Sequence, residues 1–444
     1  MTSTSSPLDH SHSEFARSWV LTANEAGCDF PIQNLPFAVF RRANSAEPFR
    51  GGVAIGDQVI DLAVVAQAQC LDGLAHTAAA ACAQPALNEF FALGPDAWKA
   101  LRHGLFELLE KAFYGAKVDA LRACLLAQHA VEFTVPTRIG DYTDFYTSMD
   151  HARNIGNMIR PDDPLAANFK WMPIAYHGRA SSIGVSGQGF NRPMGQAMPP
   201  GAKTPLFGPC ARLDYELELG IYIGQGNVQG RPIPLEKSEQ HIFGMCLLND
   251  WSARDIQFWE MAPLGPFLGK NFCTTISPWI VTMDALLPYR QAWARASDEP
   301  QPLAYLDAAT NRAQGALDIS LEVLLSTEKL RATGMPPSRL SGTSFKHQYW
   351  SIAQMVTHHT SGGCNLQAGD LLGSGTISGP GQGEAGALIE LAYGGTKPVT
   401  LGNGEQRGFL HDGDAVVLRG WCEKPGFARI GFGECRGEVL PALG

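Results

Sequence analysis

The spacing of apolar residues changes near Pro136, and this change limits the folds open to the chain. Before it, Trp98, Leu101, Leu105 and Leu108 recur every three or four residues, as on the buried face of a helix. After it, glycine and proline are frequent and long helical patterns are rare. We therefore expect a mainly β (α+β) protein whose N-terminal part carries helices and whose larger C-terminal part is rich in strands.

Short apolar runs in the N-terminal part predict strands at Phe37–Phe40, Gly52–Ile55 and Gln58–Leu62. Gly56 and Asp57 between the last two runs are typical of a hairpin turn. Val118, Leu121 and Leu125 predict a second helix. These patterns indicate one small N-terminal domain of strands and helices.

We predict a disordered tail over residues 1–27, an N-terminal domain over residues 28–136 and a C-terminal domain over residues 137–444. The segment Met1–His12 is rich in serine and threonine, and it lacks the basic and apolar regions of a secretory signal. The ten cysteines are scattered without any Cys-x-x-Cys pair, which argues against a zinc or dithiol site. A cytoplasmic protein with reduced thiols fits this pattern.

The composition excludes several classes of function. Hydrophobic residues make up 45% of the 444 residues and charged residues 17%, which is typical of a globular protein. The net charge is −9 and there is no run of lysine or arginine, so neither nucleic acid nor an anionic membrane is expected as a partner. No apolar run approaches the roughly 18 residues of a transmembrane helix.

Apolar residues and carboxylates alternate from Leu213 to Leu219. If this segment is a strand, Glu216 and Glu218 lie on one face, roughly 7 Å apart, with Asp214 beside them. Repulsion between such close charges would be relieved by a hard cation. The alternative is a half-buried strand with a solvated acidic face.

A second group of polar residues follows the apolar run Phe243–Leu248, which predicts a buried strand ending near Asp250. A helix is expected to begin with Ser252 as its N-cap and Asp255 in the capping-box position. Arg254 and Gln257 would then share one face of this helix. The alternative is a helix cap with a surface arginine.

A third group comprises Asp144 among aromatic residues, followed by His151 and Arg160. A lone histidine is more often structural than catalytic, so this pattern alone leaves the role of His151 open. The Gly-rich run at Gly373–Thr376 lacks the Gly-Lys-Ser/Thr of a P-loop. Oxygen ligands suit Ca²⁺ or Mg²⁺ better than zinc, and the candidates are Asp144, Glu216, Glu218 and Asp250.

Taken together, these segments resemble the fumarylacetoacetase (fumarylacetoacetate hydrolase) family. The similarity extends from about residue 28 to the C-terminus, over about nine tenths of the chain. The matching strings are DFPIQNLPFAVF from Asp29, IGDYTDFYTSMDHARNIG from Ile139, YHGRASSI from Tyr176, LDYELEL from Leu213, NDWSARDIQFWE from Asn249, PLGPFLGK from Pro263, GDLLGSGTISG from Gly369 and GFGEC from Gly431.

The resemblance implies an SH3-like N-terminal domain, a C-terminal mixed β-roll and a homodimer. It implies an active-site Ca²⁺ held by the four carboxylates named above, and a second ion, usually Mg²⁺, near Asp250, Lys270 and Thr274. The implied catalytic residues are the base His151, Glu390 that orients it, and the charge-stabilising Arg254, Gln257 and Lys270. The implied substrate contacts are Tyr146, Arg160, Tyr176, Gln257, Thr376 and the position of Met261. Glu390 lies in an apolar run that predicts a buried strand.

Two residues depart from the family pattern. Met261 stands where the family usually has a tyrosine, and Cys273 stands where it usually has a glycine. The implied activity is metal-dependent cleavage of the C–C bond of 4-fumarylacetoacetate, a dicarboxylate diketone, to fumarate and acetoacetate in tyrosine and phenylalanine breakdown. Two alternatives remain, a lyase or another acylpyruvate hydrolase of the same superfamily, and a Ca²⁺-dependent binding protein without catalysis.

Overall fold

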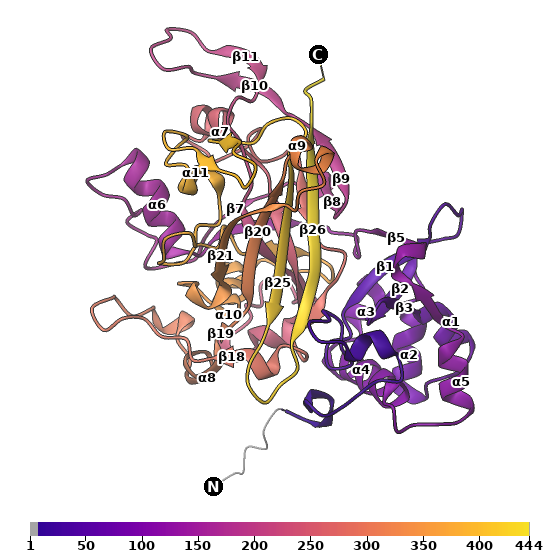
Figure 1. Cartoon of the computed structure of the whole chain (residues 1–444). Helices are drawn as coiled ribbons and strands as arrows, with labels where there is room; N and C mark the ends of the chain where they lie inside the picture. Colours follow the sequence, from indigo (N-terminus) through magenta and orange to yellow (C-terminus); the bar gives the residue numbers. More distant parts are fainter. Residues whose placement is uncertain (1–7, 444) are drawn as a thin grey trace.

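The computed structural model describes residues 8–443 and shows a mainly β protein with helices around its sheets, as predicted (Figure 1). The chain forms an N-terminal five-stranded sheet, a central eight-stranded sheet and a C-terminal five-stranded sheet. Residue 136 lies between the last strand of the first sheet and the first strand of the second. We propose that the N-terminal domain is SH3-like and that it ends at residue 136.

The N-terminal sheet has the strand order β4-β3-β2-β1-β5. Its strands are β1 (Phe37–Arg42), β2 (Arg50–Ile55), β3 (Gln58–Asp61), β4 (Leu125–Ala127) and β5 (Val131–Thr134). The helices beside it are α1 (Leu62–Gln67), α2 (Gly73–Ala81), α3 (Asn88–Ala92), α4 (Pro95–Leu109) and α5 (Ala116–Arg122). The three predicted strands and the first predicted helix are therefore present. The second helix ends at Arg122, and Leu125, which we assigned to it, begins β4 because it pairs with Ile60.

The prediction of a disordered tail is wrong for residues 8–27. This segment forms two short 3-10 helices, His10–His12 and Leu21–Asn24. Its polar groups find distant partners, because the Ser18 hydroxyl donates to the Leu109 carbonyl and His12 Nε2 lies 2.9 Å from the Asp284 carbonyl oxygen. Residues 1–7 of the predicted tail lie outside the described residues.

The central sheet has the strand order β7-β6-β22-β13-β14-β16-β8, with β17 also paired to β14. Its strands are β6 (Tyr142–Tyr146), β7 (Ile174–His177), β8 (Ile183–Val185), β13 (Leu217–Ile223), β14 (Ile242–Asp250), β16 (Thr274–Ile276), β17 (Val281–Thr282) and β22 (Leu371–Gly373). Segments far apart in the sequence thus lie side by side, and Asp144 in β6 is the register partner of Gly373 in β22.

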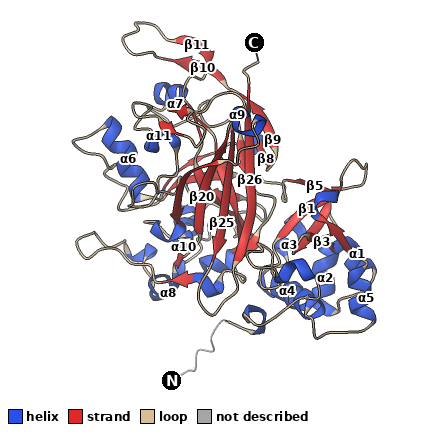
Figure 2. Ribbon diagram, in the orientation of Figure 1, coloured by secondary structure: helices blue, strands red, loops and turns tan. Residues whose placement is uncertain are grey.

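The C-terminal sheet has the order β21-β20-β25-β26-β9 and lies against the central sheet (Figure 2). Its strands are β9 (Gln188–Asn191), β20 (Ser320–Ser326), β21 (Ser338–Ser344), β25 (Ala415–Cys422) and β26 (Ile430–Leu440). Leu219 and Ile221 of β13 share one buried apolar cluster with Leu321 of β20 and Leu418 of β25. The two sheets therefore enclose the main core.

The N-terminal helices pack against the other face of the central sheet. The ring of Phe243 in β14 contacts Phe37 of β1 and Phe90 of α3, with centroid separations of 5.3 and 5.4 Å. Because successive side chains of a strand point to opposite faces, Tyr222 of β13 joins this second core while Ile221 joins the first. The central sheet is consequently buried on both faces, and its strands carry three of the four carboxylates predicted as cation ligands, Asp144, Glu218 and Asp250.

The remaining elements are short. The helices are α6 (Met149–Ile159), α7 (Arg254–Glu260), α8 (Ala309–Gln314), α9 (Glu328–Ala332), α10 (Ile352–Thr360) and α11 (Leu388–Leu391). The two-stranded pairs are β10 (Met194–Ala197) with β11 (Leu206–Pro209), β12 (Leu213–Asp214) with β15 (Ser252–Ala253), β18 (Arg290–Gln291) with β19 (Ala316–Leu317), and β23 (Val399–Thr400) with β24 (Gln406–Arg407). Within residues 8–443, none of the helices combines the length and apolarity needed to cross a bilayer. All ten cysteines are free thiols.

Candidate active site

A cavity of about 390 Å³ opens beside the end of the central sheet that carries Asp144. Of the residues proposed from the sequence, those that line it are Asp144, Tyr146, His151, Arg160, Tyr176, Glu216, Glu218, Arg254, Gln257, Met261, Lys270 and Thr376. The other three, Asp250, Thr274 and Glu390, are buried behind the lining. Asp250 contacts Lys270, Glu390 contacts His151, and Thr274 contacts Asp250. The fold therefore gathers all fifteen positions around one cavity.

Four carboxylates from three strands and one irregular segment converge at this cavity. One oxygen each of Asp144, Glu216, Glu218 and Asp250 lies within 4.8 Å of the others, and all four side chains are buried. The segment from Leu213 to Leu219 is not one continuous strand, contrary to our prediction, because β12 ends at Asp214 and β13 begins at Leu217. Glu216 lies between them, where its backbone forms an isolated bridge with Ala387.

The cluster has more negative charge than the described residues neutralise. Asp144 Oδ1 and Glu218 Oε1 are buried and have no hydrogen-bond donor. Burial and repulsion from neighbouring carboxylates raise the pKa of both side chains. A Cβ atom at Gly373 would lie 2.6 Å from Asp144 Oδ1, so the close packing of this cluster requires glycine there. Unpaired carboxylate oxygens in a buried cluster of this kind fit a divalent cation.

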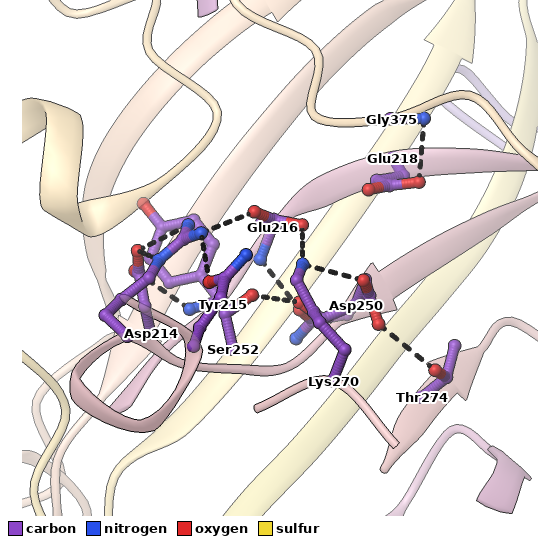
Figure 3. A network of polar contacts seen from close by, with 12 residues as sticks. Asp214, Tyr215, Glu216, Glu218, Asp250, Ser252, Lys270, Thr274 and Gly375 are labelled. Carbon is purple, nitrogen blue, oxygen red and sulfur yellow. Dashed lines mark hydrogen bonds and ion pairs between the residues drawn. The ribbon is translucent and has the colours of Figure 1, made fainter. Parts of the chain in front are cut away.

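Two buried cations, Lys270 and Arg254, neutralise part of the cluster, and Figure 3 shows Lys270 between Glu216 and Asp250. Lys270 pairs with Glu216 and, at 2.7 Å, with Asp250 Oδ2. Arg254 Nη1 lies 2.8 Å from Glu216 Oε1. Burial alone would raise the pKa of Glu216, but these two charges hold it at about 2. Burial would lower the pKa of Lys270, but Asp250 and Glu216 outweigh it and raise that pKa, so the amine is held as ammonium.

His151 and Glu390 form a buried pair at the wall of the cavity. His151 lies in the first turn of α6, where the Ser148 hydroxyl accepts the His151 backbone N–H as an N-cap. The imidazole Nδ1 is 2.7 Å from Glu390 Oε1. Burial alone would raise the pKa of Glu390, but His151 and hydrogen bonds from Asn154 and Ser378 outweigh it, and the pKa lies below its usual value.

Two local predictions in this region are wrong. Glu390 lies in the short helix α11 and not in a strand. The helix that carries Arg254 begins at that residue, because Ser252 pairs with Asp214 in a two-stranded ladder and its hydroxyl donates to the Asp250 carbonyl. In both cases tertiary pairing overrides the local pattern, yet Arg254 still lines the cavity and Glu390 still contacts His151.

The proposed substrate contacts surround the same space. The Tyr176 hydroxyl donates to Asp250 Oδ2 at 3.0 Å, and the Tyr146 ring packs edge-on against His151 with centroids 5.3 Å apart. Arg160 follows the last residue of α6 and is exposed. Met261 is 38% exposed at the rim. Arg254 Nη1 donates to Gln257 Oε1 at 3.2 Å, and Thr376 is buried at the opposite wall.

The environment of the proposed second ion contains one hydroxyl and one carboxylate. Thr274 Oγ1 donates to Asp250 Oδ1 at 3.3 Å. Cys273 is buried, and burial raises the pKa of its thiol to about 12. The thiol accepts a 3.4 Å hydrogen bond from Gln188. The cysteine at this position is therefore a neutral packing residue beside Thr274.

The sequence interpretation missed three supporting residues. Asn154 donates to Glu390 Oε2 at 2.8 Å, and the Ser378 hydroxyl lies 3.0 Å from both carboxylate oxygens. Glu260 accepts the backbone N–H groups of Phe267, Leu268 and Gly269, directly before Lys270. Asn154 could have been found from its spacing of three from His151 on one helix face. Nothing in the local pattern indicates Ser378 or Glu260.

Comparison with known proteins assigns the chain to a family. The model of the fumarylacetoacetate (FAA) hydrolase C-terminal domain matches residues 142–440, and that of the fumarylacetoacetase N-terminal domain matches residues 33–136. The chain belongs to the fumarylacetoacetase family. The fumarylacetoacetase of Homo sapiens is 47% identical over 418 residues, covering 94% of this chain and 97% of the relative. That of Oryza sativa subsp. japonica is 45% identical over 432 residues, covering 96% and 98%.

Among solved structures, a fumarylacetoacetate hydrolase from the psychrophile Exiguobacterium antarcticum is similar to this chain. The TM-score is 0.50 at 18% sequence identity, and the match covers 92% of this chain and 99% of that chain. This likeness shows a shared fold.

Proposed function

We propose that the protein hydrolyses the C–C bond of 4-fumarylacetoacetate and releases fumarate and acetoacetate. The observation that carries this proposal is that an imidazole oriented by a buried carboxylate and a four-carboxylate cluster lie at one cavity. The family's curated relatives are named for this activity and match the chain over nearly its whole length. The reaction belongs to tyrosine and phenylalanine breakdown.

We assign the carboxylates Asp144, Glu216, Glu218 and Asp250 to a Ca²⁺ ion, because Ca²⁺ accepts six to eight oxygens in irregular geometry. When bound, the cation supplies Lewis-acid polarisation of the diketone oxygens. A second ion, Mg²⁺, is proposed beside Asp250, Lys270 and Thr274. The Lys270 side chain is protonated and has no lone pair, so the side-chain ligand atoms there are the Asp250 carboxylate and the Thr274 hydroxyl.

His151 acts as the general base. Its Nδ1 carries the proton that it donates to Glu390, which leaves Nε2 as the acceptor. Nε2 takes a proton from water, and the resulting hydroxide adds to the carbonyl carbon on the fumaryl side. Glu390 fixes the tautomer of the imidazole and stabilises the imidazolium that forms.

The oxyanion that develops at that carbonyl needs donors aimed at it. Arg254, Gln257 and Lys270 line the cavity next to the carboxylates and are these donors. When the C–C bond breaks, fumarate forms and the electron pair remains on the acetoacetate carbon. The proton held on His151 Nε2 is available to neutralise that carbon.

The substrate is a dianion, so a cationic residue of the cavity lining is expected to bind at least one of its carboxylates. We assign Arg160 to a terminal carboxylate and Tyr146, Tyr176, Gln257 and Thr376 to the polar middle of the substrate. Met261 occupies the family's tyrosine position at the rim and contributes an apolar contact. We also propose that the protein is a cytoplasmic homodimer, on the resemblance to its family.

The test is incubation of the purified protein with fumarylacetoacetate, following the loss of diketone absorbance and identifying both products. We expect fumarate and acetoacetate in equal amounts, and loss of turnover in His151→Ala. Cleavage of other acylpyruvates with fumarylacetoacetate untouched would replace the proposal with a different hydrolase of the same superfamily. Calcium binding without any cleavage would replace it with a binding protein.

A further inference from the structure

Asp214 is a fully buried carboxylate that does not line the cavity. It lies in β12 opposite Ser252 of β15. Figure 3 shows it at one end of the polar network that continues through Glu216 and Lys270 to Asp250. A buried carboxylate is costly unless it is paired and hydrogen-bonded, so its partners indicate why it is there.

On one side Asp214 holds Arg254. Its Oδ2 accepts from Arg254 Nε at 2.9 Å, and Nη2 lies 2.8 Å from the same oxygen. The opposite edge of the guanidinium contacts Glu216 and Gln257 through Nη1. Nη2 is buried, and beyond its ion pair with Asp214 it has no hydrogen-bond partner among the described residues. Because this nitrogen carries two N–H groups, it can also donate to a negatively charged oxygen.

On the other side Asp214 caps the helix that carries Glu390. The backbone N–H of Leu388 donates to Oδ1 at 2.9 Å, and that of Ile389 donates to Oδ2 at 3.2 Å. No side chain of its own N-cap residue caps α11. One carboxylate therefore satisfies two of the N–H groups that a helix start leaves unpaired.

We propose that Asp214 is a positioning residue that fixes the Arg254 guanidinium and the Glu390 helix turn relative to each other. It thereby aligns the donor for the oxyanion with the carboxylate that orients His151. The inference rests on the proposed function, in which both groups act on the same carbonyl. A role in stability alone is the competing explanation, since removing one partner of a buried ion pair destabilises a protein.

The chain offers a matched control for that explanation. Asp414 is buried, pairs with Arg407 at 2.8 and 3.0 Å and accepts the backbone N–H of His411. It is absent from the cavity lining. Asp414→Asn thus removes a similar buried charge from a similar pair without touching the site.

The experiment measures kcat, KM, bound cation and unfolding midpoint for the wild type, Asp214→Asn and Asp414→Asn. We expect Asp214→Asn to lower kcat about 10²-fold, with KM and cation content close to the wild type, because small misplacements of catalytic groups cost about that much. Asp414→Asn should lower the unfolding midpoint and leave kcat unchanged. Combining Asp214→Asn with Arg254→Gln or Glu390→Gln should cost less than the product of the separate losses.

A folded, cation-loaded Asp214→Asn protein with wild-type kcat would overturn the inference. So would a loss of kcat in both double variants that equals the product of the losses in the corresponding single variants. Arg254→Lys keeps the charge but cannot make the two-nitrogen contact with Asp214. Near-native kcat in that variant would overturn the inference even if Asp214→Asn does not fold. Wild-type protein that leaves fumarylacetoacetate intact would overturn the proposed function and this inference with it.

Discussion

Replacing Glu390 by glutamine keeps the shape of the side chain and removes its charge. The carboxylate lies 2.7 Å from His151 Nδ1 and receives hydrogen bonds from Asn154 at 2.8 Å and from Ser378 at 3.0 Å. A hydrogen bond to a charged group contributes about 1.5–3 kcal/mol. Because about 1.36 kcal/mol corresponds to a tenfold change in rate, losing this stabilisation of the imidazolium should lower kcat about 10- to 150-fold.

The assay is steady-state hydrolysis of fumarylacetoacetate with the bound cation measured in the same samples. Asn154→Ala is the matched control, because it removes one hydrogen bond from Glu390 and leaves the charge next to His151. We expect a smaller loss of kcat in that control. His151→Ala should lower kcat by about 10²–10⁴, the range of general-base catalysis.

The reasoning would be refuted if Glu390→Gln turned over substrate at the wild-type rate with its cation bound. The imidazole would then need no charged partner. If His151→Ala also kept near-native turnover, His151 would not be the base.

Three further predictions concern the cation and the loop that follows α7. Exhaustive chelation should lower both activity and the unfolding midpoint, because the buried carboxylates would then repel one another. Full activity in protein that elemental analysis shows to be free of metal would contradict the cation assignment. Met261→Tyr should change KM by no more than about tenfold, the ~1.4 kcal/mol of one modest hydrogen bond, and should fold normally because Met261 is partly exposed. Glu260→Gln should lower kcat and speed proteolysis within residues 261–269, because the Glu260 carboxylate accepts three backbone N–H groups next to Lys270. An unchanged kcat and an unchanged rate of proteolysis would show that Glu260 does not position Lys270.

The sequence predicts the composition of the site better than its local structure. The alternation around Glu216 and Glu218 indicates their convergence, because Glu218 lies in a regular strand and Glu216 directly precedes it. The residue at the end of β14, Asp250, follows from the apolar run before it. Asp144, His151, Arg160, Arg254 and Gln257 also stand out in the sequence pattern, and the resemblance to the family supplies the remaining predicted residues and the roles of all of them.

The local structure that the sequence does not reveal is set by contacts between residues far apart in the chain. Ser252 has the composition of a helix N-cap, but pairing with Asp214 places it in a ladder. Glu390 lies in an apolar run typical of a strand, but Asp214 caps a helix there from 174 positions away. Local propensity cannot detect such contacts, because the two partners are far apart in the sequence and meet only in the tertiary fold.

The central claim is that water adds to the carbonyl on the fumaryl side of the substrate. The most direct test is a reaction in H₂¹⁸O with mass spectrometry of the products. The account predicts fumarate with a single ¹⁸O atom in a carboxylate, together with acetoacetate. Malonate and 4-oxopent-2-enoate, the products of attack on the other ketone, or fumarate without the label, would contradict it.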